Sequence, residues 1–153
     1  MPVKRYLVLR VLVIIILFLL AIQYELGMAV NIGNPPSLPP AHFSYNGAVG
    51  ALNQAGVTAV IHASLGSSLV IFAAVILVLS LRSGVRSVQV FGSLACLATL
   101  LAATTGLLFV LSGYQNNGDT HGMATNFLLA YTFYFLELYF LKPISHDGVG
   151  YGH

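Results

Sequence analysis

Val57–Leu81, with the sequence VTAVIHASLGSSLVIFAAVILVLSL, is the stretch that decides the fold: it contains no aspartate, glutamate, lysine or arginine. A helix needs ~20 apolar residues to cross the hydrocarbon core of a bilayer, and this stretch exceeds that length. Similar apolar stretches cover residues 6–30, 88–111 and 121–141. Together they leave no length for a soluble domain. We therefore expect one all-α domain over residues 1–153, an integral membrane four-helix bundle.

The composition excludes most soluble classes of protein. The 153 residues are 58% hydrophobic and only 7% charged, whereas soluble domains carry about 25% charged residues. No Walker motif, Rossmann fingerprint or CxxC pair is present. The first apolar stretch is longer than the core of a signal peptide, so we expect a retained transmembrane helix.

The positive charges predict the orientation in the cell membrane. The outer loops, residues 31–56 and 112–120, contain no lysine or arginine. The positive-inside rule then places both termini and the short middle loop in the cytoplasm, with the helices running up-down-up-down. The net charge of +2 comes from this pattern and does not indicate nucleic-acid binding. The basic residues that define it are Lys4, Arg5, Arg10, Arg82, Arg86 and Lys142.

The loop at residues 31–56 is the largest segment outside the predicted spans. Four prolines, at positions 35, 36, 39 and 40, favour an extended or polyproline-like path. Residues 43–55 after them predict a short helix at the membrane interface, where Tyr45 would suit the aromatic belt.

Two histidines, His62 and His121, lie in apolar segments. Each stands roughly 20 residues before a positive charge, Arg82 and Lys142 respectively, which is about 30 Å along a helix. Both are therefore expected near the outer face at the same depth. Ionisable side chains inside a membrane usually have a function and a partner. The second and fourth helices of such a bundle are diagonal, so each histidine is expected to face the other.

One hypothesis is a b-type haem whose iron is ligated by His62 and His121. Gly66 lies one turn from His62 on the same face, where it would let a flat macrocycle approach the backbone. The outer loops offer no lysine or arginine to the propionates, which would then need other partners. Aromatic residues of the fourth span are expected to form the pocket wall: Phe127, Tyr131, Phe133, Tyr134 and Phe135.

Two alternatives use the same residues. Glu25 stands roughly 20 residues after Arg5, so it shares the depth of His62 and His121. Two histidines and a carboxylate are the ligand set of mononuclear iron sites and some zinc sites. The three side chains could instead bridge helices by hydrogen bonds, with no cofactor, as in a structural subunit.

Glu137 lies near the predicted inner face, about a turn and a half before Lys142. A glutamate there can reach lipid headgroups or pair with a lysine, and we prefer this interpretation to proton transfer. Asp119, at the outer end of the fourth span, is typical of a helix N-terminus.

Four spans with one histidine on the second and one on the fourth resemble the small membrane b-type cytochromes. The chain also resembles one half of haem A synthase, which is likewise a four-helix bundle. The resemblance covers the whole chain in architecture, depends on His62 and His121, and implies one haem near the outer face. That family has a glutamate and an arginine around the histidine of helix two, where this chain has Ala59 and Ala63.

These observations predict a membrane electron-transfer protein, or a respiratory-chain subunit, that holds one b-type haem. It would pass electrons between an outer donor and a quinone or a partner subunit. The alternatives are a cofactor-free accessory subunit of a membrane complex and an enzyme like haem A synthase. Expected partners are membrane lipid, other membrane subunits or further copies of this chain, but not nucleic acid.

Overall fold

The computed structural model describes residues 3–32, 38–41 and 44–141, and within them all regular structure is helical. The expected all-α class is therefore confirmed. Lys142 lies outside the described residues. The five helices are α1 (Val3–Ile32), α2 (Tyr45–Ala55), α3 (Val57–Leu81), α4 (Arg86–Leu111) and α5 (Asn117–Phe140).

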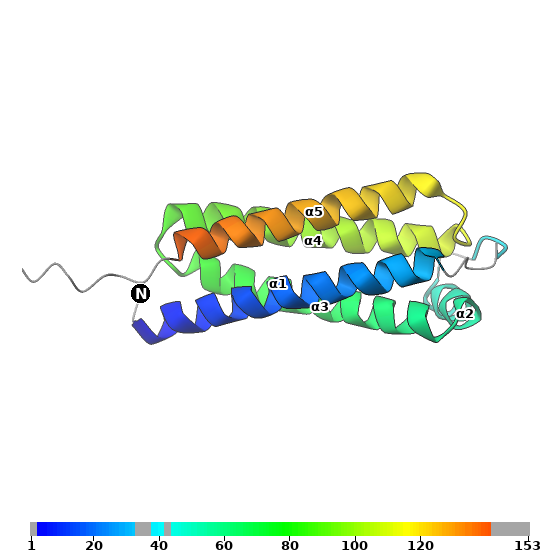
Figure 1. The fold of residues 1–153 in the computed structure, drawn as a ribbon, viewed down its shortest axis with the longest axis horizontal. Helices are drawn as coiled ribbons and strands as arrows, with labels where there is room; N and C mark the ends of the chain where they lie inside the picture. The colour runs from blue at the N-terminus through cyan, green and yellow to red at the C-terminus, as the bar shows by residue number, and fades with distance from the viewer. Residues whose placement is uncertain (1–2, 33–37, 42–43, 142–153) are drawn as a thin grey trace, which may run out of the picture.

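Four long helices, α1, α3, α4 and α5, run side by side, and the short α2 lies at one end of them (Figure 1). Successive long helices run in opposite directions. The start of α1, the α3–α4 turn and the end of α5 therefore share one end of the molecule (Figure 1). We call it the basic end because Arg82 and Arg86 lie in or beside that turn. The opposite end, with α2 and the α4–α5 turn, is the α2 end.

The helices that carry His62 and His121 are diagonal. Within the described residues, α3 packs against α1, α2 and α4, and α5 packs against α1 and α4. No direct backbone packing joins α3 to α5 in this part of the chain. Any contact between these two helices must therefore be made by side chains that reach across the centre.

Three helices are long and apolar enough to cross a membrane, by length and composition: residues 6–31 of α1, all of α3 and all of α4. Three of the expected spans are thus confirmed as candidates. α5, with 24 residues, is nearly as long as α3 and α4, but it is less apolar because it contains Asn117, Asp119, His121, Asn126 and Glu137. Its role as the fourth span stays a prediction.

The apolar side chains divide between an interior and an outer surface. Val13 and Ile16 of α1 and Ala73 and Ile76 of α3 are fully buried in the central core. Other large side chains are exposed, including Phe18 on α1 (67% exposed), Ile71 on α3 (70%) and Leu128 on α5 (63%). An apolar belt on all sides is typical of a surface that contacts lipid rather than water.

The proline-containing loop is bound to the α4–α5 turn. The backbone N–H of Leu38 donates to Gly113 O at 3.2 Å, and that of Ala41 donates to Leu111 O at 2.9 Å. Gln115 Nε2 donates to Leu38 O at 2.9 Å. Gly113 has a φ of 70°, and a Cβ there would overlap the carbonyl of Leu38. Only glycine satisfies both constraints, so this residue lets the loop close over the α2 end.

Two local features position α2 before α3. Ser44 is the N-cap of α2, and its Oγ accepts a hydrogen bond from Gly47 N at 3.0 Å. Gly56, with a φ of 97°, separates α2 from α3 and allows the sharp change of direction. The expected short helix over residues 43–55 is therefore present from residue 45. Its position at a membrane interface stays a prediction.

Candidate functional site

A cavity of about 290 Å³ lies between the helices in the half of the molecule near the α2 end. All five helices contribute to its walls. Small side chains leave the space, because a helix lined with glycine and alanine cannot fill the centre of a bundle. Those that line the cavity are Gly27, Ala59, Ala63, Gly66, Ala102, Ala103, Gly106, Ala124 and Ala130.

His62 lines this cavity from α3 and packs against α1. A Cβ on Gly27 would lie 3.0 Å from Cε1 of His62, so the imidazole occupies the space that this glycine leaves. Gln23, one turn earlier on α1, donates from Nε2 to the backbone carbonyl of His62 at 3.1 Å. The same Nε2 lies 3.3 Å from Nε2 of His62.

These contacts assign the proton on the neutral imidazole. A carbonyl oxygen only accepts, so the Gln23 group beside His62 O must be the amide nitrogen. The second hydrogen of that NH₂ then points to Nε2 of His62, which accepts it. The ring proton is therefore on Nδ1. Nδ1 is buried and has no hydrogen-bond partner.

Unpaired polar atoms gather at the cavity. Five buried side-chain atoms in the described part of the chain lack a hydrogen-bond partner, and three belong to residues that line it. These three are Nδ1 of His62, Oε1 of Gln23 and the hydroxyl of Tyr114. Because buried polar atoms are normally paired, such a group needs an explanation, and a bound ligand is one.

Tyr114 is unusual in its backbone as well. Among the described residues it is the non-glycine with a positive φ, 64°. A bulky residue in this region is strained, and such strain is frequent at functional sites. The ring packs edge-on against Phe109, with centroids 5.3 Å apart. Burial raises the pKa of Tyr114, so its hydroxyl remains a donor.

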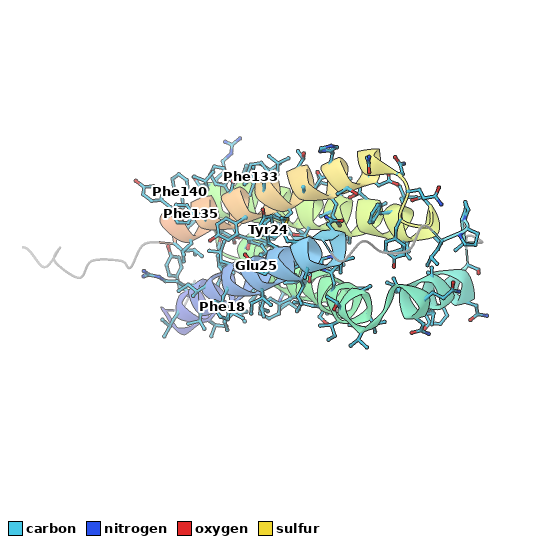
Figure 2. The ribbon with its side chains drawn as sticks, turned by 45° about the vertical axis from the view of Figure 1, so that its right-hand side comes forward. Phe18, Tyr24, Glu25, Phe133, Phe135 and Phe140 are labelled. Carbon is cyan, nitrogen blue, oxygen red and sulfur yellow. The ribbon has the colours of Figure 1, made fainter. Side chains whose placement is uncertain are left out.

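The aromatic wall is smaller than the sequence predicted. Phe127 lines the cavity and packs against Tyr24 of α1, with ring centroids 5.5 Å apart. Phe133 and Phe135, by contrast, lie along the half of α5 near the basic end (Figure 2). They are not among the lining residues, and neither is Tyr131. Tyr134 is fully buried and does not line the cavity.

The structure does not bring His121 and Glu25 to His62. Both side chains are exposed, and neither lines the cavity. Glu25 follows Tyr24 on α1, and Figure 2 labels both. Among the described residues, no three histidine, cysteine, aspartate or glutamate side chains come together as metal ligands would.

A haem fits these residues only in part. His62 lines the cavity and could hold the iron, while His121 is exposed and does not line the cavity. Gly66 does not present an open face either, because a Cβ there would lie 3.0 Å from Nε2 of Gln23. Ligation of the haem iron by both histidines stays a prediction. It requires the first turns of α5 to rotate so that His121 reaches the cavity.

Two residues of the site were missed from the sequence. Tyr114 carries one of the three unpaired atoms, and Gly27 makes room for His62. The sequence shows Gln23 as a polar residue near the predicted depth of His62, but it does not show the hydrogen bond between them. Nothing in the sequence marks Tyr114, because its importance comes from a positive φ and from burial.

The position of Glu137 also differs from the one that the sequence predicted. Its side chain is fully buried in the core, not at the headgroups, and its Oε1 is hydrogen-bonded to Ser80 Oγ of α3. This bond reaches across the diagonal between α5 and α3. Cys96 is buried and free, in agreement with the absence of any disulfide partner.

Comparison with known proteins adds no relative: no family model, no curated protein and no solved structure matches this chain.

Proposed function

We propose that the chain is a multi-pass membrane protein with four transmembrane helices and both termini in the cytoplasm. Three candidate spans and the outward apolar side chains support a membrane location. On α5, Leu128 and Phe135 are 63% and 58% exposed, which supports contact of this helix with lipid as well. The basic end faces the cytoplasm, because the loops of the α2 end contain no lysine or arginine.

We further propose that the cavity binds the ring of a lipid-soluble quinone, and that the protein serves electron transfer in the membrane. The carrying observation is the set of three unpaired polar atoms on residues that line a mostly apolar cavity. Nδ1 of His62 and the hydroxyl of Tyr114 are donors, which match the two carbonyl oxygens of a quinone. Oε1 of Gln23 is an acceptor, which matches a hydroxyl of the reduced quinol.

The size and lining of the cavity favour this class of ligand. About 290 Å³ is at the lower end of ligand cavities, which span ~300–1,000 Å³. That volume suits a single substituted ring better than a porphyrin. Tyr24 and Phe127 offer ring faces on which a quinone can stack. The cavity is partly open, so an apolar tail can leave it toward the lipid.

A b-type haem is the second candidate, and one observation favours it. His62 stands in a cavity lined by glycine and alanine, which a macrocycle could enter if the helices moved apart. In that case His62 and His121 would hold the haem iron. The two proposals differ in the histidines that they require. The haem needs both His62 and His121, whereas the quinone needs His62 and not His121.

The test compares two histidine variants of the purified protein in lipid nanodiscs. The chain has no tryptophan and eight tyrosines, so quenching of tyrosine fluorescence reports the binding of a short-chain quinone. We expect His62→Ala to weaken binding by ~3–10-fold, the value of one hydrogen bond. His121→Ala, on an exposed side chain, is the matched control and should bind like the wild type.

Each other outcome overturns the quinone proposal. A reduced-minus-oxidised spectrum with sharp low-spin bands, lost in both variants, would establish the bis-histidine haem instead. Equal quinone affinity in wild type and His62→Ala would show that the cavity is not the binding site. No binding and no spectrum would favour the cofactor-free accessory subunit.

A further inference from the structure

A second buried polar group lies in the half of the molecule near the basic end, outside the cavity. Glu137 of α5 is 0% exposed, and its Oε2 has no hydrogen-bond partner. No lysine, arginine or histidine of the described part of the chain forms an ion pair with it. A carboxylate without a counter-charge in such surroundings is strongly disfavoured, and the group becomes neutral by taking up a proton.

The hydrogen bonds around Ser80 lead to the same assignment. Ser80 Oγ lies 2.8 Å from the carbonyl oxygen of Ile76 and is also hydrogen-bonded to Oε1 of Glu137. A hydroxyl has one hydrogen, and a backbone carbonyl can only accept. If Ser80 donates to Ile76 O, the hydrogen between Ser80 and Glu137 must come from the carboxyl group. A protonated Glu137 satisfies both bonds at once.

The surrounding helices are shaped for this contact. Gly92 of α4 lies between α3 and α5, and a Cβ there would be 2.7 Å from Ser80 Cβ and 3.1 Å from Oε1 of Glu137. The absence of a side chain at Gly92 lets the side chains of Ser80 and Glu137 meet across the diagonal. The contact is therefore built into the packing of three helices and does not depend on a flexible surface.

Polar side chains continue from Glu137 toward the cavity. Tyr134 lies one turn before Glu137 on α5 and is fully buried. Its hydroxyl is beside Thr99 of α4, without a well-formed hydrogen bond. Thr99 in turn lines the cavity.

The other titratable groups around Glu137 are few. Cys96 of α4 lies near Tyr134. On α1, Tyr6 donates from its hydroxyl to the carbonyl of Phe140, and Arg10 lies near Tyr6. α3 contributes only the neutral hydroxyl of Ser80 to this contact. None of these groups supplies a positive charge in contact with the carboxyl.

We propose that Glu137 is a proton-binding site, which holds a proton on its carboxyl group and exchanges it with the cavity by way of Tyr134. The carboxyl O–H donates to Ser80 Oγ in the loaded state. The site depends on Glu137, Ser80, Tyr134 and Thr99 and not on a ligand of the cavity, so it stands whether the cavity binds a quinone, a haem or neither.

Infrared spectroscopy of the full chain in lipid tests this site. The carbonyl stretch of a protonated carboxylic acid is separate from the carboxylate bands. We expect the wild type to show it at neutral pH and Glu137→Gln to lose it. The amide of glutamine can donate to Ser80 as the acid does. Glu25→Gln, on an exposed carboxyl, is the control and should keep the band.

Two further variants complete the test. Ser80→Ala removes the acceptor and should shift the band, which keeps the assignment testable if Glu137→Gln does not fold. In D₂O the wild-type band should shift as the proton exchanges, and Tyr134→Phe should slow that shift several-fold. A wild type without the band, a band that persists in Glu137→Gln, or Tyr134→Phe exchanging at the wild-type rate would overturn the proposal.

Discussion

At the scale of single residues, the cavity depends on how one imidazole is held. His62 is fixed between Gln23, which donates to its backbone carbonyl, and Gly27, against which its ring packs. Both partners come from α1, so the first helix determines where Nδ1 points. The histidine itself is apparent in the sequence, but its orientation follows from a glycine on another helix.

Gly27→Ala should therefore impair ligand binding without removing any polar group. The added Cβ would lie 3.0 Å from Cε1 of His62, so the ring must move away and Nδ1 with it. We expect quinone affinity to fall by ~3–10-fold, as for the loss of one hydrogen bond. Tyrosine fluorescence titration measures this effect.

Gly50→Ala is the matched control for that experiment. Gly50 is also helical, in α2, but a Cβ there meets nothing within 4 Å. It should bind like the wild type, with slightly higher stability because alanine favours a helix by about 1 kcal/mol over glycine. If the two variants bind alike, the position of the imidazole does not control the site.

At the scale of elements, the loop before α2 closes the α2 end by bonding to the α4–α5 turn. Three hydrogen bonds join residues 38–41 to Leu111, Gly113 and Gln115. The same turn holds Tyr114 in its positive-φ conformation. The loop, the turn and the edge of the cavity thus form one connected unit.

Gly113→Ala should detach this loop. The substitution combines a positive φ of 70° with overlap between Cβ and the carbonyl of Leu38. We expect faster proteolysis near residues 38–41 and a lower unfolding temperature. Gly84→Ala is the control, because Gly84 has a φ of 75° but open space around it. It should cost only the strain, about 1 kcal/mol; equal proteolysis of both variants would contradict the role of the contact.

At the scale of the whole molecule, the distribution of basic residues and the apolar surface both indicate a helical membrane protein. The basic residues of the α3–α4 turn and the start of α1 are at one end, and α2 is at the other (Figure 1). Between them, Phe18, Ile71 and Leu128 point outward. A long apolar body with one positive end is the arrangement expected of a helical membrane protein.

Labelling of single cysteines tests this orientation in intact cells. In a Cys96→Ala background, Asn53→Cys on α2 should react with a membrane-impermeant maleimide added outside. Val85→Cys, in the exposed α3–α4 turn, should react only after the membrane is permeabilised. The reverse pattern would place the termini outside, and equal labelling of both would contradict a membrane-spanning arrangement.

Sequence alone was sufficient for the helices and their length. The apolar stretches predicted α1, α3 and α4 to within a few residues, because a bilayer imposes its thickness on each helix separately. Even the short α2 was apparent from residues 43–55. The depth of His62 in the membrane, counted from Arg82, stays a prediction.

Only the tertiary structure decided which side chains meet. His62 faces the cavity while His121 and Glu25 are exposed, and Glu137 is in the core with Ser80 rather than at the headgroups. Depth along a helix follows from hydropathy, but rotation about its axis follows from packing against neighbours. Here glycines on other helices, Gly27 and Gly92, set those rotations through close contact. No property of an isolated segment contains that information.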